Sequence, residues 1–244
     1  MAYEQMLGQG GMDVTTATVS HGPATVRPSL SRRGAPLPQP RVKNAMIRTI
    51  DIVVASVALV FISPLMIVVA VLCRLQDSGP VIFAQSRCGR GGQMFKCLKF
   101  RSMVVDADVR LAKLLESDPE ARAEWTSTHK LVKDPRVTGL GRFLRKSSID
   151  ELPQLINVLR GEMSLVGPRP IVTGEIGRYG HYMDDYNSVL PGITGLWQVS
   201  GRSDTDYRRR VALDVLFIRK RSLGLYLYIL FMTVPAVLLR KGAH

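Results

Sequence analysis

Asp150 and Glu151 are adjacent carboxylates in residues 148–153, where the chain reads Ser-Ile-Asp-Glu-Leu-Pro. Ser148 and Glu151 are spaced as a capping box, so this segment predicts the start of a helix. Free N–H groups and the helix dipole at such a start stabilise ionised carboxylates. An ionised aspartate is a nucleophile, and its neighbour can bind a divalent metal through oxygen. The alternative is that both residues only cap the helix.

Three basic side chains are candidates for binding phosphate. Arg145 lies five residues before Asp150, and a guanidinium fits phosphate oxygens. Arg169 stands between two prolines, each of which fixes φ at about −65°, so its loop is stiff and suits bidentate recognition. Lys99 lies in a basic segment where strand alternation places it on one face with Arg101. Taken singly, these residues are equally compatible with a surface loop and a solvated strand.

The elements expected to carry these residues are short. Residues 81–83 and 94–100 predict a hairpin around a glycine-rich turn. Helical patterns follow at 104–127, with a break at Asp118-Pro119, then at 138–146, from 148 to Gly161, at 173–186 and at 205–221. Residues 191–201 form a loop punctuated by glycine and proline, with Trp197 inside it. That loop could hold a nucleotide or a sugar, or be only a structured connection.

The composition predicts an anionic partner. The 244 residues include 33 Lys and Arg against 20 Asp and Glu, a formal net charge of +13. Nucleic acid, lipid headgroups and phosphorylated metabolites are all compatible with this surplus. A hydrophobic content of 46% excludes a wholly disordered chain. The cysteines and histidines form neither a C-x-x-C nor an H-E-x-x-H motif, so neither a disulfide framework nor a zinc site is expected.

Residues 52–73 carry no charge, and a straight helix of this length measures about 33 Å, enough to cross a hydrocarbon core of about 30 Å. Pro64 in the middle removes a backbone hydrogen bond and kinks the helix. Basic residues flank both ends, so the positive-inside rule gives no orientation. A helix that breaks at Ser63-Pro64 and leaves on the side it entered satisfies both observations. The Ser63 hydroxyl would then cover a carbonyl that the proline frees. An ordinary kinked spanning helix is the alternative.

The two ends of the chain differ in character. Residues 1–44 lack hydrophobic periodicity and are rich in Gly, Pro, Ser and Thr, which predicts a disordered basic tail. Residues 223–239 carry no charge, contain Pro235 and end before Arg240-Lys241. Because this run is short for a membrane crossing, it favours an interfacial helix.

Taken together, these segments resemble the bacterial sugar transferase family, the monotopic polyprenyl-phosphate hexose-1-phosphate transferases. The matching segments are the apolar helix with Ser63-Pro64 and residues 95–103, 150–158, 160–170 and 191–198. They occur in the family's order and cover roughly residues 45–243. The short length of the chain and the amino-acid sequence of residues 196–202 look most similar to members of the family that start exopolysaccharide synthesis.

The resemblance implies a two-step reaction at the cytoplasmic face of the bacterial inner membrane. Asp150 would attack the β-phosphate of a UDP-hexose, galactose first and glucose next, and expel UMP. Undecaprenyl phosphate would then attack the sugar-phosphoryl aspartate. Glu151, with Asp150, would hold Mg²⁺. Lys99, Arg145 and Arg169 match positions that contact phosphates.

The expected fold is mainly α with a short β-hairpin, in a monotopic membrane protein with a re-entrant helix and a small cytosolic catalytic domain. The expected parts are the tail (1–44), the re-entrant helix (45–75), the catalytic domain (76–222) and the interfacial helix (223–244). The expected partners are UDP-hexose, undecaprenyl phosphate and inner-membrane lipids; a homodimer is left open. Two rival hypotheses are a non-catalytic member of the same fold and a membrane-anchored module that binds nucleic acid or anionic lipid. The chain has no helix-turn-helix, zinc-finger, RRM or KH motif, so nucleic acid is not expected.

Overall fold

A computed structural model describes residues 41–128, 131–132, 134–200 and 206–238. All of them lie in one compact unit. The expected tail lies outside the described residues apart from its last four, which are helical. The helices are α1 (Arg41–Gln76), α2 (Ala107–Ser117), α3 (Pro119–Thr128), α4 (Gly139–Ser147), α5 (Gln154–Arg160), α6 (Ile176–Tyr179), α7 (Met183–Asn187), α8 (Leu196–Val199), α9 (Tyr207–Lys220) and α10 (Leu223–Leu238). The strands are β1 (Ile82–Cys88), β2 (Met94–Phe100), β3 (Ser164–Val166) and β4 (Gly192–Thr194).

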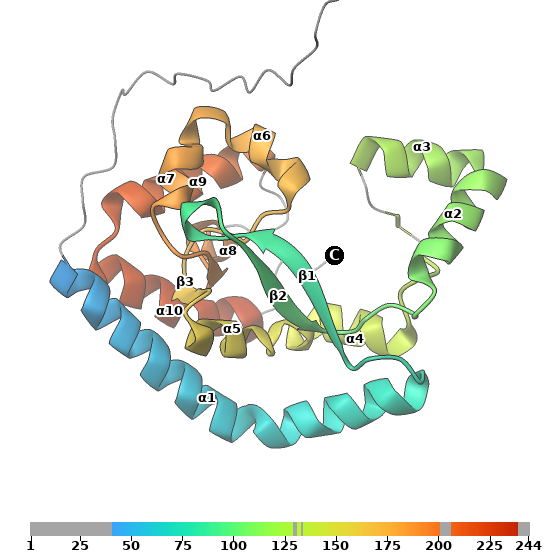
Figure 1. Ribbon diagram of the computed structural model, residues 1–244, viewed down its shortest axis with the longest axis horizontal. Helices are drawn as coiled ribbons and strands as arrows, with labels where there is room; N and C mark the ends of the chain where they lie inside the picture. Colours follow the sequence, from blue (N-terminus) through green and yellow to red (C-terminus); the bar gives the residue numbers. More distant parts are fainter. Residues whose placement is uncertain (1–40, 129–130, 133, 201–205, 239–244) are drawn as a thin grey trace, which may run out of the picture. The chain divides into compact units, whose positions relative to one another are not determined.

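The long apolar helix α1 continues through Pro64, and Figure 1 shows it bent rather than straight. Proline has no N–H to donate to the carbonyl four residues earlier, which leaves the oxygen of Val60 without its helical partner. The Ser63 hydroxyl donates to that oxygen at 2.9 Å. The expected hydrogen bond of Ser63 to the carbonyl that the proline frees is therefore confirmed, whereas Pro64 bends the helix and does not end it.

Most of α1 faces outward with apolar side chains. Its segment Asn44–Gln76 has a mean hydropathy of 2.9 over its most apolar window, of which 11% is buried. Val60, Phe61 and Leu75 are each more than two thirds exposed. A helix of this length and composition can cross or enter a membrane, and its exposed apolar surface distinguishes it from the core helix of a soluble protein.

Two small sheets carry the described strands. The expected hairpin is confirmed as β1 paired antiparallel with β2, with Lys99 opposite Phe83. The second sheet, β3 paired parallel with β4, was not expected. A Cβ on Gly192 would collide with the backbone nitrogen of Gly167, so the approach of these two chain segments depends on glycine.

The expected helical segments are largely confirmed. The helix at 104–127 is two helices, α2 and α3, divided at Asp118, whose carboxylate accepts from the backbone N–H groups of Glu120 and Ala121. Thr138 caps α4 by accepting from Gly141 N at 2.8 Å. Residues 173–186 are a series of short helical turns with α6 and α7 among them.

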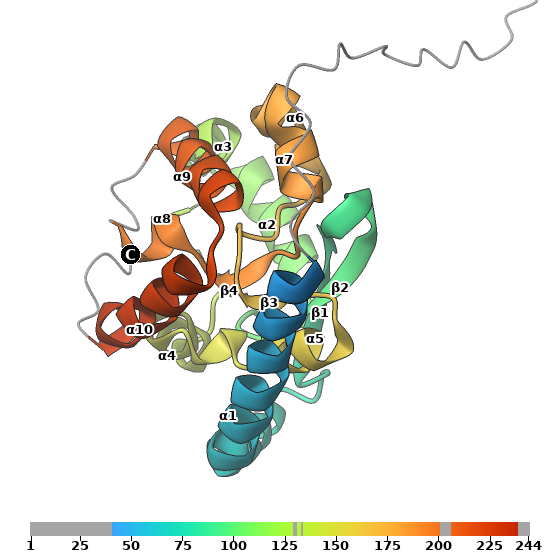
Figure 2. The same cartoon turned by 90° about the vertical axis from the view of Figure 1, so that its left-hand side faces the viewer.

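The core that positions the site joins α1, α5, β3 and α10 (Figure 2). Asp51 on α1 is 1% exposed and ties three of these elements together. Its Oδ1 accepts from Ser164 Oγ, from Leu165 N at 2.7 Å and from the hydroxyl of Tyr226 at 2.6 Å. Buried carboxylates are stable only with such partners, so Asp51 fixes α1 and α10 against β3.

Candidate functional site

Asp150 and Glu151 lie in a 3₁₀ turn, residues Ile149–Glu151, between α4 and α5. The predicted capping box is wrong. Ser148 has a φ of 57°, in the left-handed region, and its side chain caps nothing. It ends α4 by donating its backbone N–H to Arg145 O, and α5 itself begins only at Gln154. The sharp reversal at Ser148 points the two carboxylates towards β2 instead of towards the N-terminal amides of α5.

The ammonium group of Lys99 stands between the two carboxylates. Its nitrogen lies 2.6 Å from Glu151 Oε1 and 3.9 Å from Asp150 Oδ2. Lys99 comes from β2, so the hairpin delivers the cation and the α4–α5 connection delivers the acids. A positive charge held between two acids lets both be ionised at close range, which bare carboxylates resist.

Asp150 is 7% exposed, and its burial raises its pKa to about 6. Lys99 and Arg145 act to lower this pKa, while Glu151 raises it further. The expectation that a helix start lowers this pKa is therefore wrong, because desolvation outweighs the favourable charges. A carboxylate with a pKa near 6 is ionised at neutral pH and is a better nucleophile than one at its ordinary value.

The pKa of Glu151 is shifted in the opposite direction from that of Asp150. Burial acts to raise its pKa, but Lys99, Arg169 and Arg87 outweigh burial and hold that pKa below its ordinary value. Its side chain keeps 38% of its surface exposed. The two adjacent residues thus differ: Asp150 is desolvated and has a raised pKa, whereas the surrounding cations hold Glu151 in its ionised form. Such a division of roles between two neighbouring carboxylates is typical of catalytic pairs.

Arg145 is positioned by a close contact between α4 and the segment after β2. Its Nε donates to Ser102 Oγ at 2.8 Å. A Cβ on Gly141, one turn earlier, would collide with the carbonyl oxygen of Ser102. Glycine is thus needed for α4 to approach this segment, and the approach orients Arg145 within electrostatic range of Asp150.

Arg169 is exposed on a loop that is fixed from behind. The hydroxyl of Tyr186 donates to Cys88 O at 2.8 Å, lies 3.2 Å from Arg169 O and accepts from Ile171 N at 3.3 Å. In front, the guanidinium of Arg169 lies 5.9 Å from the centre of the Trp197 ring. These contacts hold the backbone still while leaving the charged group accessible to an anion.

Several residues that support the site were not singled out from the sequence. Arg87 on β1 donates to Pro170 O at 3.1 Å, and burial lowers its pKa, with Arg169 lowering it further. Asn157 on α5 donates to Lys96 O at 2.8 Å and accepts from Leu98 N at 3.0 Å. This buried amide fixes the strand that carries Lys99 against the helix that follows Asp150.

Asp214 on α9 is a further buried acid, close to the loop that carries Arg169. It is 1% exposed, accepts from the Tyr179 hydroxyl at 2.7 Å, and its burial raises its pKa to about 7. The sequence indicates this role only through the position of Asp214 in the helix. It shares a helix face with Val211, Val215 and Ile218, all of which are buried. An acid among such residues indicates a buried hydrogen-bond partner.

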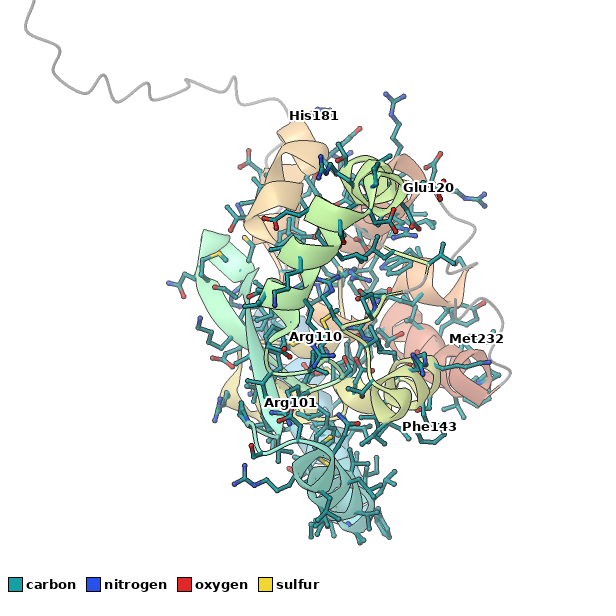
Figure 3. All side chains as sticks on the ribbon, turned by 90° about the vertical axis from the view of Figure 1, so that its right-hand side faces the viewer. Arg101, Arg110, Glu120, Phe143, His181 and Met232 are labelled. Carbon is teal, nitrogen blue, oxygen red and sulfur yellow. The ribbon has the colours of Figure 1, made fainter. Side chains whose placement is uncertain are left out.

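The five predicted polar site residues thus share one electrostatic neighbourhood: Lys99, Arg145, Asp150, Glu151 and Arg169. Ser63 and Pro64 lie apart from it, on the bend of α1. Arg101, expected on a strand face with Lys99, lies beyond β2 and is buried; it donates to Asp77 O at 3.1 Å and to Cys73 O at 3.3 Å (Figure 3). It joins β2 to the end of α1.

The two carboxylates are compatible with Mg²⁺. Among the described residues, no cluster of three or more His, Cys, Asp or Glu side chains could form an all-protein metal site. Mg²⁺, however, is commonly held by one or two carboxylates, with substrate phosphates and water completing its octahedron. Asp150 and Glu151 supply two hard oxygen ligands within reach of one cation, Lys99. Two carboxylates are thus a chemically suitable partial donor set for Mg²⁺, with the remaining ligands coming from outside the protein.

The part of the chain that carries this site is also the part that is similar to known proteins. Residues 42–240 match the bacterial sugar transferase family. An undecaprenyl-phosphate galactose phosphotransferase of Salmonella typhimurium is 51% identical over 197 residues, which is 81% of this chain and 41% of that protein. The exopolysaccharide production protein ExoY of Rhizobium meliloti is 47% identical over 81% of this chain and 87% of its own length.

A third relative extends the comparison towards the N-terminus. A UDP-glucose:undecaprenyl-phosphate glucose-1-phosphate transferase of Caulobacter vibrioides is 38% identical over 234 residues, which is 93% of this chain and 81% of that protein. The chain therefore spans less than half of the Salmonella relative and most of the other two.

Proposed function

The chain belongs to the bacterial sugar transferase family, and we propose that it transfers hexose-1-phosphate from a UDP-hexose to undecaprenyl phosphate. The observation that carries this proposal is the Lys99 ammonium between Asp150 and Glu151. A buried acid with a pKa near 6, beside a persistent anion and several cations, suits attack on a phosphate.

In the first step, a carboxylate oxygen of Asp150 attacks the β-phosphorus of the UDP-hexose. A new oxygen–phosphorus bond forms, and the bond from that phosphorus to the bridging oxygen breaks. UMP leaves with the bridging oxygen and its electron pair. The hexose stays on the phosphoryl group, which is now joined to Asp150 as an acyl phosphate. No proton has to be removed from the nucleophile, because Asp150 is ionised above about pH 6.

In the second step, a phosphate oxygen of undecaprenyl phosphate attacks the same phosphorus. The bond to Asp150 breaks, the carboxylate is regenerated, and the product is undecaprenyl diphosphate hexose. Each substrate therefore meets the reactive centre in turn, which predicts ping-pong kinetics.

The cations of the site stabilise the charge that develops on the diphosphate. Lys99 and Arg145 flank Asp150, and Arg169 presents a guanidinium from a loop held by Tyr186. Glu151 and Asp150 would hold Mg²⁺, which when bound neutralises charge on the diphosphate. Fixed cations in a site from which water is partly excluded need little reorganisation when the charge develops.

The two apolar helices support a proposed membrane arrangement. We propose that α1 enters the inner membrane from the cytoplasmic face, turns at the bend by Pro64 and returns to that face. The Ser63–Val60 hydrogen bond supports this path, because a polar carbonyl inside the membrane needs a partner. Helix α10, with Phe231 and Val234 exposed, lies in the interface. The soluble UDP-hexose and the lipid phosphate then meet at one surface.

The donor sugar is proposed as galactose, with glucose next. The Salmonella relative, named for galactose, is 51% identical, while the Caulobacter relative, named for glucose, is 38% identical. The experiment is UMP release by the purified chain with Mg²⁺, undecaprenyl phosphate and a panel of UDP-sugars. We expect release with UDP-galactose and a lipid-linked hexose product. Absence of UMP with every UDP-sugar would contradict the proposal and favour a binding protein without catalysis.

A further inference from the structure

A polar cavity lies at the other end of α5 from Asp150. Its volume is about 330 Å³, and its wall includes Arg48, Arg90 and Arg221, here called the arginine pocket. Arg48 comes from α1, Arg90 from the turn between β1 and β2, and Arg221 from the residue pair that joins α9 to α10. We propose that the arginine pocket binds the phosphate of an anionic membrane phospholipid that takes no part in the reaction.

Arg48 and Arg221 each have an N–H donor that makes no hydrogen bond to the described part of the protein. Arg48 donates to Val158 O at 2.6 Å and to Leu159 O at 3.0 Å, which leaves its Nε for a ligand. Arg221 donates to Asn44 Oδ1 from Nη1, and its Nε is buried without a hydrogen-bond partner. Burial lowers the pKa of Arg221, and the nearby Arg90 lowers it further, against Asp51 and Tyr226.

The third arginine, Arg90, is exposed and makes no side-chain hydrogen bond or ion pair within the described part of the chain. The buried Nε of Arg221, which has no acceptor, is costly in the absence of an anion, whereas the exposed guanidinium of Arg90 is hydrated and accessible to a ligand. A phosphate would bind both groups, since arginine forks match phosphate geometry.

Asp51 also lines the cavity but does not cancel its charge. Its Oδ1 accepts three hydrogen bonds from Ser164, Leu165 and Tyr226. The carboxylate is therefore already engaged with β3 and α10. Three arginines against this one acid leave the cavity with a net positive charge, and an anion is the ligand it favours.

The position of the arginine pocket identifies the source of the phosphate. On α1, the charge-free run 52–73 begins four residues after Arg48, and on α10 it begins two residues after Arg221. Both helices thus change from polar to apolar at the same cavity. In a bilayer this change marks the boundary between headgroups and acyl chains. The phosphates of the lipid headgroups lie at that level, and the acyl chains would run along exposed apolar residues of the charge-free run, such as Val53 and Val57.

The pocket is separate from the catalytic carboxylates. Gly161, which also lines it, follows the last residue of α5, whereas Asp150 and Glu151 precede the first. A helix of this length measures about 10 Å. A phosphate held in the arginine pocket is thus too far from Asp150 to attack an acyl phosphate there. The inference rests on the membrane position of α1 and α10 and not on the transfer reaction.

The test measures binding of dioctanoyl phosphatidylglycerol to the full chain in neutral detergent, from the rise in melting temperature with lipid concentration. Dioctanoylglycerol, which lacks the phosphate, and inorganic phosphate, which lacks the chains, are the comparison probes. We expect saturable binding of the phospholipid, and binding of each comparison probe at least about tenfold weaker. Equal binding of dioctanoylglycerol would overturn the phosphate site, and equal binding of inorganic phosphate would overturn the lipid as its source.

The variants are Arg90→Gln and Arg221→Gln, with Arg208→Gln on the exposed face of α9 as the matched control for loss of one charge. We expect about tenfold weaker phospholipid binding in each pocket variant, the loss of one charge-assisted contact, and no change in the control. Arg90→Gln decides the result if Arg221→Gln does not fold, because Arg90 is exposed.

Unchanged binding by Arg90→Gln, or an equal loss in Arg208→Gln, would contradict the inference. Asp150→Asn should bind the phospholipid normally while losing transfer, which separates this site from the proposed reaction. Displacement of the phospholipid by stoichiometric undecaprenyl phosphate in that variant would show that the pocket belongs to the acceptor and would also overturn the inference.

Discussion

Lys99 Nζ lies 2.6 Å from Glu151 Oε1, so this lysine is paired with the acid that is not the proposed nucleophile. The same nitrogen is 3.9 Å from Asp150 Oδ2. Asp150 is therefore close enough to the cation to be ionised and far enough to keep its oxygen free for attack.

Formation of the acyl phosphate should depend on the ionisation of Asp150. Burial raises its pKa to about 6, and only the deprotonated carboxylate attacks. We therefore expect the rate of UMP release to rise about tenfold per pH unit below pH 6 and to level off above it. The measurement is a rapid-quench burst with UDP-galactose and no undecaprenyl phosphate, because the acceptor phosphate itself titrates near pH 6. A rate that is constant from pH 5 to pH 8 would argue against Asp150.

Replacing Lys99 by methionine should move this profile. Lys99 lowers the pKa of Asp150, so its loss should shift the midpoint of the pH profile to higher pH. The maximal burst rate should also fall by about 10²-fold or more, since a cation near the reacting phosphate is lost. Lys96→Met is the matched control, because Lys96 is an exposed lysine on the same strand. An unchanged midpoint in Lys99→Met would show that the ammonium does not act on Asp150.

Asp150→Asn should stabilise the folded protein at neutral pH. A pKa raised from 3.8 to about 6 means that the folded state holds the ionised acid less well than the unfolded state does. The resulting penalty is absent below about pH 4, grows between pH 4 and pH 6, and reaches at most about 3 kcal/mol above that. We expect a higher melting temperature for the variant at pH 8 and a much smaller difference at pH 4. A variant less stable at pH 8 would contradict the desolvation of Asp150.

Both ends of α1 should lie on the cytoplasmic side. Ala45 and Gln76 are exposed near the two ends of the helix, and the native cysteines are buried. We expect Ala45→Cys and Gln76→Cys to resist a membrane-impermeant maleimide in intact cells and to react after the membrane is opened. Labelling of one position alone from outside would mean that α1 crosses the membrane.

The sequence patterns located the elements better than the connections between them. The apolar run of α1, the glycine turn of the hairpin and the helix at 138–146 are local features, and each appears close to where it was expected. The β3–β4 pair was missed because its strands are three residues long and their pairing depends on the contact between Gly167 and Gly192. Such a contact between distant segments has no periodic signature.

The sequence predicted which residue types form the site, but it did not predict how deeply those residues are buried or how their pKa values shift. Asp150, Glu151 and Lys99 could be chosen because their chemistry suits phosphoryl transfer. The raised pKa of Asp150 depends on burial, and burial depends on Ser148 turning left-handed. The sequence favoured a capping role for Ser148 instead, because spacing alone does not distinguish an N-cap from the C-cap of the preceding helix.

The central claim, a covalent hexose-phosphoryl aspartate, is tested most directly by intact-protein and peptide mass spectrometry. The purified chain is incubated with Mg²⁺ and UDP-galactose in the absence of undecaprenyl phosphate and is quenched in acid. We predict one added hexose phosphate per chain, located on the peptide that contains Asp150, absent from Asp150→Asn and discharged when undecaprenyl phosphate is added. Turnover without any such adduct, together with activity of Asp150→Asn, would contradict the account.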